Sequence, residues 1–234
     1  MQMVKASEGG DDRRRVLLLG ASRGLGLALA RVLRDDGWDV TATERRRSDA
    51  LHALGVTVET VDISVRPTIE ALAARLASAP PFDLLLVNAG TMGPAHQDPV
   101  EASAAEIASL FATNAVGPVA AARILGPRLR PEACVAIMSS RVGSIGDNHS
   151  GGVELYRASK AALNMLAKCY ALSPEGLNRP VLLLHPGWVR TAMGGPDAPL
   201  DPEESAAGLL EVIAAEGRMP GLRYMDYRAR AIPW

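Results

Sequence analysis

The sequence has little of what would indicate a disulfide scaffold, a metal centre or a nucleic-acid-binding surface. It contains 2 cysteines in 234 residues, Cys134 and Cys169, and neither belongs to a CxxC pair. Two isolated cysteines usually pack as small hydrophobic residues in a reducing compartment, so we expect no metal site and a cytoplasmic protein. The 25 basic and 26 acidic residues nearly cancel, which leaves no global field to attract nucleic acid or an anionic membrane.

Long hydrophobic runs are also lacking. Residues 1–12 are polar and acidic, without the apolar core of a signal peptide, and we expect them to form a disordered tail. No later apolar run reaches the length needed to cross a membrane, which predicts a soluble protein. The sequence is 48% hydrophobic and has no long linker, so residues 13–234 are expected to form one α/β domain with a small-molecule ligand.

The sequence does have a glycine-rich turn between an apolar strand and a helix. Residues 16–19 are aliphatic, as a central parallel strand requires, and the apolar residues from position 25 onward keep helical spacing. Glycines let a pyrophosphate approach the backbone N–H groups, and the helix dipole favours its charge, which predicts a dinucleotide site. Many α/β domains use such glycines merely to turn tightly. The residues assigned to this cradle are Gly20, Ser22, Arg23, Gly24, Leu25 and Gly26.

The next predicted strand, residues 39–43, ends at Glu44 and Arg45. In dinucleotide-binding folds, the residues at this place determine whether NAD or NADP is preferred. An acid at this place holds the ribose hydroxyls of NAD, whereas an arginine accommodates the extra phosphate of NADP. Arg23 brings a second cation to the same spot, so NADP(H) is favoured. Glu44 keeps NAD(H) open as the alternative, and a run of arginines is also typical of a solvated loop.

Two further strand ends have residues that suit a bound cofactor. Asp62-Ile63 follows a strand over residues 56–61, where Asp62 would either bond the adenine amino group or cap a turn. Asn88-Ala89-Gly90 follows a strand over residues 83–87. Small residues there let the backbone approach a flat ring, although an ordinary strand-to-loop turn has the same composition.

The middle of the chain places polar residues beside an apolar strand and a long helix. An alanine-rich helical region over residues 102–125 is expected to be interrupted around Asn114 and Gly117-Pro118. Asn114 needs hydrogen-bond partners if it is buried and would otherwise be an ordinary cap or kink residue. The strand over residues 133–138 runs into Ser139-Ser140, and polar residues at the carboxyl end of a strand lie where catalysis occurs in such folds.

Tyr156 and Lys160 lie four residues apart on one face of a predicted helix. A free tyrosine has a pKa of about 10, and a neighbouring ammonium, especially beside a positively charged nicotinamide, would move it toward neutral pH. Such a pair alone is usually a solvated helix face. Its position after Ser139-Ser140 and downstream of a dinucleotide turn favours a general acid instead.

Taken together, these motifs resemble those of the short-chain dehydrogenase/reductase family from Arg15 to the C-terminus. The motifs occur in the family's order: Gly20-x-x-x-Gly24-x-Gly26, Asn88-Ala89-Gly90, Asn114, Ser140, Tyr156-x-x-x-Lys160 and Pro186-Gly187 followed by Thr191. Finer features, including His185-Pro-Gly-Trp-Val-Arg-Thr191, resemble the sniffer-like carbonyl reductase and C-factor branch. The sequence departs from the family pattern in two places, because Ser140 lies sixteen residues before Tyr156, where about a dozen is common, and because Ala192 stands where an aspartate often follows the threonine.

The resemblance implies a fold and an activity. The fold is a single-domain Rossmann-type, doubly wound parallel seven-stranded sheet with helices on both faces. The activity is reversible hydride transfer between NADP(H) and a carbonyl or alcohol, with carbonyl reduction as the favoured direction. A homodimer or homotetramer through the helix that starts near Tyr156 is implied as well. The alternative from another class is a nucleotide-sensing regulatory protein that keeps the fold without required turnover.

The resemblance also implies roles for individual residues. Tyr156 is the proton donor or acceptor, and Ser140 holds the substrate oxygen. Lys160 binds the nicotinamide ribose and lowers the tyrosine pKa, while Asn114 anchors a water relay to Lys160. The nicotinamide would be held by Pro186, Gly187, Val189 and Thr191. The proline- and glycine-rich residues 193–202 that follow have the composition of a mobile connection over the substrate, or of a plain surface loop.

Overall fold

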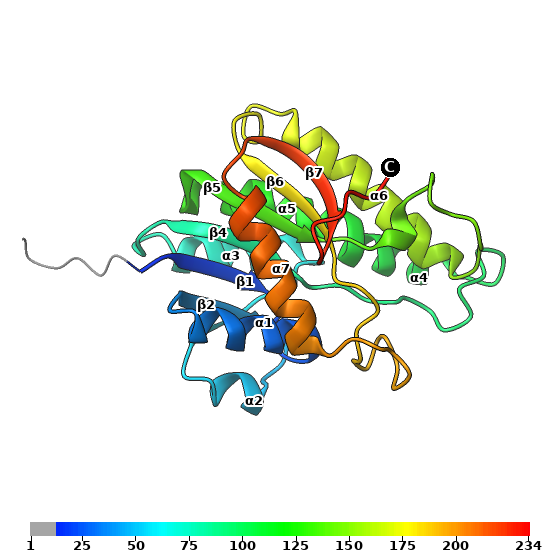
Figure 1. Cartoon of the computed structure of the whole chain (residues 1–234), viewed down its shortest axis with the longest axis horizontal. Coiled ribbons are helices and arrows are strands. Elements are labelled where there is room, and N and C mark those ends of the chain that lie inside the picture. Colours follow the sequence, from blue (N-terminus) through cyan, green and yellow to red (C-terminus); the bar gives the residue numbers. More distant parts are fainter. Residues whose placement is uncertain (1–12) are drawn as a thin grey trace, which may run out of the picture.

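The computed structural model describes residues 13–234, so the expected tail at residues 1–12 lies outside the described residues. Seven parallel strands form one sheet in the order β3-β2-β1-β4-β5-β6-β7, and helices cover both of its faces (Figure 1). The strands are β1 (Arg15–Leu19), β2 (Asp39–Glu44), β3 (Thr57–Thr60), β4 (Phe82–Val87), β5 (Leu129–Met138), β6 (Pro180–His185) and β7 (Gly221–Asp226). The predicted fold class is therefore confirmed.

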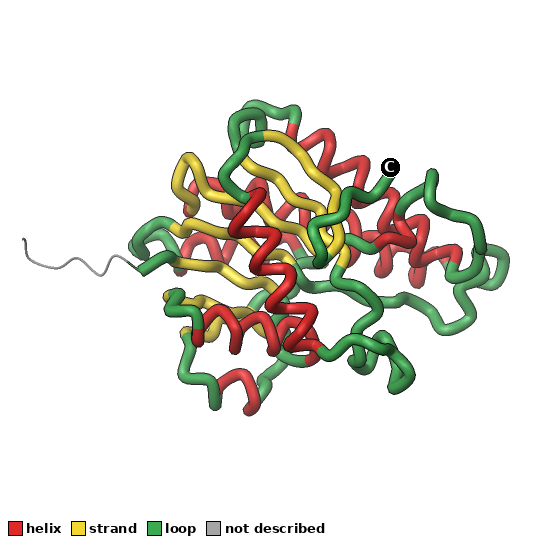
Figure 2. The backbone as a smooth tube through the Cα atoms, in the orientation of Figure 1, coloured by secondary structure: helices red, strands yellow, loops and turns green. Residues whose placement is uncertain are grey.

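Each face of the sheet has its own set of helices and its own hydrophobic core. The helices are α1 (Gly24–Asp35), α2 (Asp49–His52), α3 (Arg66–Arg75), α4 (Ala104–Phe111), α5 (Gly117–Leu125), α6 (Glu154–Ala171) and α7 (Pro202–Glu216). Helices α3, α5 and α6 lie on one face of the sheet, and α1 and α7 lie on the other (Figure 2). The buried residues of each set pack on the strand residues that face them. Alternate residues of the central strands face the two cores, which explains why those strands are apolar throughout.

The strand order places the predicted site at the point where the chain changes direction across the sheet. The chain builds outward from β1 through β2 to β3, and then returns to place β4 on the other side of β1. The connections after β1 and β4 therefore lead to helices on opposite faces of the sheet, and open α/β sheets bind their ligands at such a point.

A π-helical turn, Ala112–Val116, joins α4 to α5 at the predicted interruption around Asn114. Gly117-Pro118 does not interrupt the helix, because both residues lie in the first turn of α5, where proline is tolerated. The continuous stretch Ala104–Arg128 is long and apolar enough to cross a membrane by length and composition, contrary to the expectation from the sequence. Here its buried residues from α5 belong to the core beneath the sheet, as in the core helix of a folded domain.

Candidate active site

The glycine turn after β1 is built against the end of β4. Gly20 has a φ of +88°, and a Cβ there would lie 2.7 Å from the Cα of Ala89. A Cβ on Gly26 would lie 2.6 Å from Nδ2 of Asn88, which itself donates a hydrogen bond of 2.8 Å to the carbonyl of Gly20. These two glycines are therefore required by close packing, and the predicted cradle and Asn88-Ala89-Gly90 form one structure.

The start of α1 suits an anionic group. Arg23 occupies the N-cap position of this 12-residue helix with extended backbone, and its side chain makes no capping hydrogen bond. The first turn contains no acidic residue that would repel a phosphate. Glycine at positions 24 and 26 keeps side chains away from the backbone N–H groups, so the residues present fit a dinucleotide pyrophosphate.

The segment after β6 folds back over the glycine turn, as its predicted role in cofactor binding requires. A Cβ on Gly24 would lie 3.2 Å from Cγ2 of Thr191. Pro186 is held by a hydrogen bond of 2.7 Å from Oγ of Ser205 in α7, and Gly187 turns the chain with a φ of +84°. Val189 forms a bridge with Leu200. This bridge joins the two ends of the loop between Val189 and Leu200, which contains most of the proline- and glycine-rich residues 193–202. The loop is therefore held at its base by contacts within the folded chain.

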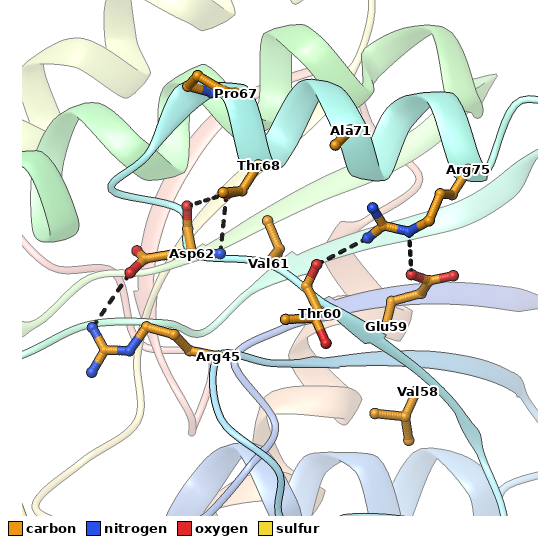
Figure 3. Close-up of a pocket in the computed structure, with 10 residues that line it drawn as sticks. All are labelled: Arg45, Val58, Glu59, Thr60, Val61, Asp62, Pro67, Thr68, Ala71 and Arg75. Carbon is orange, nitrogen blue, oxygen red and sulfur yellow. Dashed lines mark hydrogen bonds and ion pairs between the residues drawn. The ribbon is translucent and has the colours of Figure 1, made fainter.

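At the end of β2, Glu44 and Arg45 point to different neighbours. The buried carboxylate of Glu44 accepts a hydrogen bond of 2.6 Å from the backbone N–H of Ser48 and lies 3.0 Å from Nε2 of His52. The Arg45 side chain is 64% exposed, and its Nη1 lies 3.6 Å from Oδ2 of Asp62 (Figure 3). Both oxygens of Glu44 are thus engaged toward α2, whereas the Arg45 guanidinium remains accessible beside Asp62.

Asp62 and Ile63 have different roles: the Asp62 side chain caps a turn, and the Ile63 side chain packs in the core. Oδ1 of Asp62 accepts hydrogen bonds from the backbone N–H and the hydroxyl of Ser64, at 3.0 and 2.6 Å, so the capping role is present. Burial pushes the pKa of Asp62 upward, but the bonds from Ser64 and the charge of Arg45 outweigh it and hold the pKa below its ordinary value. The Ile63 side chain is buried in the core, which leaves only its backbone for a ligand.

Ser140, Tyr156 and Lys160 come together where β5 ends and α6 begins. The side chain of Ser140 acts on Tyr156 as a hydrogen-bonding partner that lowers the pKa of the phenol. Nζ of Lys160 lies 5.8 Å from the centroid of the Tyr156 ring and donates a hydrogen bond of 2.9 Å to the carbonyl of Met138. A Cβ on Gly143 would lie 2.7 Å from Cβ of Lys160, so the loop after Ser140 packs directly on α6.

Burial dominates the titration of this site. It raises the pKa of Tyr156 to about 12, although the hydrogen bond with Ser140 acts in the opposite direction. Burial also lowers the pKa of Lys160 to about 8. The structure therefore differs from the expectation that Lys160 brings the tyrosine pKa toward neutrality, because the ammonium is directed at Met138 rather than at the phenol. At neutral pH the Tyr156 hydroxyl keeps its proton.

Asn114 is fully buried in the π-helical turn, and its side chain has the partners that burial demands. Oδ1 accepts a hydrogen bond of 2.8 Å from the N–H of Thr91, and Nδ2 donates to the carbonyl of Thr91 and to Oγ of Ser159, at 2.7 and 3.0 Å. A Cβ on Gly90 would lie 3.4 Å from Oδ1 of Asn114 and 3.7 Å from Nζ of Lys160. The structure thus gathers Asn114, Lys160 and the loop after β4 around Gly90.

Some residues that support the site were missed from the sequence. The buried Tyr224 in β7 donates a hydrogen bond to the backbone carbonyl of Ser140, and Asn164 in α6 accepts one of 2.6 Å from Oγ of Ser139. Gln97 accepts a hydrogen bond of 2.9 Å from the N–H of Tyr156. Each contact joins segments that are distant in sequence, and a single polar residue in a loop or strand gives no local signal of such a partner.

The comparisons with known proteins agree with this arrangement. The family described as short chain dehydrogenase matches residues 14–199. The chain belongs to the short-chain dehydrogenase family. Its relatives include the C-signal protein of Myxococcus xanthus, which is 41% identical over 158 residues, covering 66% of this chain and 93% of that protein.

Solved structures of the short-chain dehydrogenase family also resemble the chain closely. A carbonyl reductase from Pseudomonas aeruginosa PAO1 in complex with NADP has a TM-score of 0.86 and 41% identity, covering 95% of this chain and 100% of that one. The carbonyl reductase Sniffer of Drosophila melanogaster has a TM-score of 0.83 and 28% identity, covering 95% of this chain and 100% of that one. The predicted resemblance to the sniffer-like and C-factor branch is confirmed.

The longer spacing between Ser140 and Tyr156 corresponds to a loop that is fastened to α6. A short 3₁₀ turn, Arg141–Gly143, follows Ser140 directly. Nε of Arg157 then donates to the carbonyls of Gly151 and Gly152, at 3.0 and 2.8 Å, just before α6 starts. The extra residues therefore form a loop beside Tyr156 without displacing Ser140 from it.

Proposed function

We propose that this short-chain dehydrogenase transfers a hydride between NADP(H) and a carbonyl or alcohol, with carbonyl reduction as the favoured direction. The observation that supports this most strongly is the joint placement of Ser140, Tyr156 and Lys160 beside the loop at Gly90. That loop in turn packs on the glycine turn of the cofactor cradle. Burial keeps the Tyr156 hydroxyl protonated at neutral pH, so the proton that carbonyl reduction requires is present.

In the proposed chemistry, each side chain of the site has a separate role. NADPH, when bound, supplies the hydride that reaches the carbonyl carbon. The Ser140 hydroxyl holds the substrate oxygen, and Tyr156 gives that oxygen its proton, so the product is the alcohol. Lys160 binds the nicotinamide ribose, and Asn114 anchors the loop after β4 and a water relay toward Lys160. Pro186, Gly187, Val189 and Thr191 hold the nicotinamide.

NADP(H) is the cofactor that the charges at the end of β2 favour. Arg23 and Arg45 both present a cation near the place of the adenosine ribose, and Glu44 directs both carboxylate oxygens toward Ser48 and His52. The P. aeruginosa relative is described in complex with NADP. NAD(H) remains the alternative, which requires Glu44 to turn back toward the ribose hydroxyls.

We also propose that the protein forms a homodimer or homotetramer through α6 in the cytoplasm. The outward face of this helix exposes Met165, Cys169 and Leu172, and Met165 is 65% exposed. Apolar side chains on one exposed helix face are typical of subunit contacts. Light scattering at micromolar concentration tests this proposal, and Met165→Glu should shift the protein toward monomer.

The experiment that tests the function is turnover of NADPH with a panel of aldehydes, ketones, diketones and quinones. Consumption of NADPH with any carbonyl, together with formation of the alcohol, supports the enzyme. Binding of NADPH without turnover of any member would favour the alternative, a nucleotide-sensing regulatory protein. The gathered Ser140, Tyr156 and Lys160 argue against that alternative, because sensing alone needs no general acid.

A further inference from the structure

Gln97 joins the loop after β4 to the helix that presents Tyr156. It is 9% exposed, and its backbone has a φ of +61°, in the left-handed region that side-chain-bearing residues rarely adopt. Nε2 donates to the carbonyls of Met92 and Pro94, at 2.7 and 2.6 Å, and Oε1 accepts the N–H of Tyr156 at 2.9 Å. The amide group is thus used at both ends, toward its own loop and toward α6.

The start of α6 needs this contact. The first four N–H groups of a helix have no partner within the helix, and a side chain at the N-cap usually satisfies one of them. Here the N-cap residue is Val153, which has a φ of +41° and cannot accept a hydrogen bond with its side chain. Gln97, which lies 59 residues earlier in the chain, supplies the missing acceptor to Tyr156.

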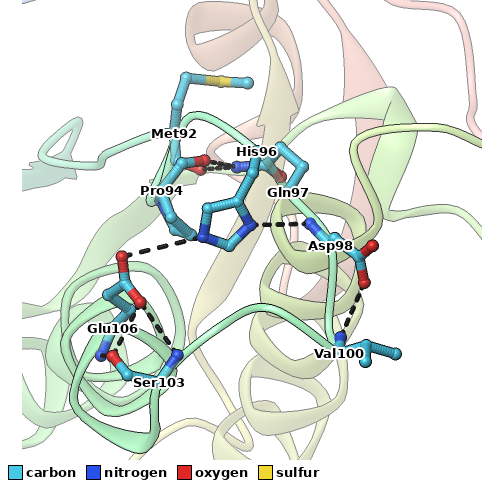
Figure 4. A network of polar contacts seen from close by, with 8 residues as sticks. All are labelled: Met92, Pro94, His96, Gln97, Asp98, Val100, Ser103 and Glu106. Carbon is cyan, nitrogen blue, oxygen red and sulfur yellow. Dashed lines mark hydrogen bonds and ion pairs between the residues drawn. The ribbon is translucent and has the colours of Figure 1, made fainter.

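The loop around Gln97 is itself held in place by polar contacts (Figure 4). Nδ1 of His96 accepts a hydrogen bond of 3.1 Å from the N–H of Asp98, and Nε2 of His96 lies 3.8 Å from Oε1 of Glu106. Glu106 and Ser103 form a capping box at the start of α4. These contacts fix the residues on both sides of Gln97, so its left-handed backbone is maintained by its surroundings.

We propose that Gln97 is a positioning residue for Tyr156, which sets the first turn of α6 relative to the loop at Gly90 and thereby the place of the phenol. This inference rests on the proposed function, since it assigns Gln97 a role in the transfer of a proton by Tyr156. Positive φ at both Gln97 and Val153 supports it, because residues held in such conformations cluster where a structure over-determines a functional group.

Two truncations separate the role of the side chain from stability. Gln97→Ala removes both sets of hydrogen bonds and keeps the backbone strain, whereas Gln97→Gly removes the same bonds and relieves that strain. Both should lower kcat by about 10-fold to 100-fold, as a small misplacement of a reacting group does, with KM for NADPH unchanged within about twofold. Gln97→Gly should be the more stable of the two to urea and no more active.

Gln97→Glu separates the hydrogen bond that Gln97 accepts from Tyr156 from the two that it donates to Met92 and Pro94. Its carboxylate still accepts the N–H of Tyr156, but when ionised it cannot donate to Met92 and Pro94. We expect this variant to keep the Tyr156 amide protected and to have a higher kcat than Gln97→Ala. The matched control is Ser173→Ala, which removes the hydrogen bonds of the Ser173 hydroxyl to the carbonyl of Tyr170 and to Glu175 at the opposite end of α6. It should lose a similar amount of stability and keep the kcat of the unchanged protein.

Amide hydrogen exchange provides a measurement that does not depend on turnover. The Tyr156 amide should exchange faster in Gln97→Ala by on the order of tenfold, the effect of losing one helix cap. Unchanged exchange at Tyr156, or a fall in kcat as large in Ser173→Ala as in Gln97→Ala, would overturn the inference. If the unchanged protein consumes no NADPH with any carbonyl, the proposed function fails, and the assignment of Gln97 to proton transfer fails with it. The exchange data still decide whether Gln97 holds the start of α6.

Discussion

Replacing Arg45 tests the proposed cofactor preference at an exposed arginine that follows β2. In the structure Nη1 of Arg45 lies 3.6 Å from Oδ2 of Asp62, and its side chain is 64% exposed. An ion pair so exposed contributes about 0.2–1 kcal/mol. A charge-assisted bond from the same guanidinium to the 2′-phosphate of NADPH would contribute roughly 1.5–3 kcal/mol.

Exchanging the ion pair for the phosphate bond leaves a net gain of about 1–2 kcal/mol, which corresponds to roughly 5-fold to 30-fold in Kd. Arg45→Ala should therefore weaken NADPH binding by that factor and leave NADH binding nearly unchanged. The assay is titration of nucleotide fluorescence at low salt, since screening weakens exposed charges. The ratio of the Kd for NADH to the Kd for NADPH should decrease as salt is added.

The neighbouring Arg47 offers a matched control. It has the same charge, but its Nε lies 3.1 Å from Oδ1 of Asp49 at the start of α2. Arg47→Ala should leave the preference for NADPH intact, whereas Glu44→Ala should increase it by deleting a negative charge. The reasoning would be refuted if the unchanged protein bound NADH more tightly than NADPH, or if Arg47→Ala and Arg45→Ala weakened NADPH binding equally.

Three further outcomes follow from the packing and burial of single residues. Lys160→Met should lower kcat and also weaken NADPH binding, because the ammonium lies 5.8 Å from the centroid of the Tyr156 ring and, in the proposed function, binds the nicotinamide ribose. A change in only one of these parameters would contradict this dual role. Gly26→Ala should lower the free energy of unfolding by about 1–3 kcal/mol, since the new Cβ collides with the backbone carbonyl oxygen of Gly20 and with Asn88. A urea midpoint equal to that of the unchanged protein would contradict this close packing. Burial lowers the pKa of His185 to about 4, with Arg141 and Arg230 acting in the same direction and Asp226 opposing. Because the unfolded histidine binds a proton below about pH 6.5 and the folded one does not, stability should fall by roughly 2 kcal/mol from pH 7 to pH 5, and His185→Gln should remove that part of the loss in urea titrations.

Local patterns in the sequence predicted most of the fold. The apolar run before Gly20 and the helical spacing after it gave β1 and α1, and Gly37 ends that helix with a φ of +80°. The predicted ends of the strands were less accurate. The strand β5 begins at Leu129 rather than at Ala133, because Leu129 pairs with Phe82 of β4 and the exposed residues 130–132 continue the strand. The short helix α2 has too few residues to show a periodic pattern.

The residues of the candidate site could be predicted where the neighbouring sequence explains the residue type. Glycines at tight turns, and a tyrosine and a lysine one helical turn apart, are visible in sequence. The directions of side chains are not. Glu44 turns toward the N–H of Ser48 and the ring of His52, and Lys160 turns toward the carbonyl of Met138, because the path of the folded backbone brings these partners near. The raised pKa of Tyr156 follows from burial, which no spacing rule contains.

The most direct test of the central claim compares carbonyl-dependent NADPH consumption by the unchanged protein and by Tyr156→Phe. The account predicts turnover by the unchanged protein, and a kcat at least about 100-fold lower in Tyr156→Phe with NADPH binding retained, the effect of losing a general acid. Tyr170→Phe is the matched control, because it removes from the same helix a buried hydroxyl that has no hydrogen-bond partner among residues 13–234, and it should keep full activity. Turnover by Tyr156→Phe at nearly the rate of the unchanged protein would contradict the assignment of the proton donor.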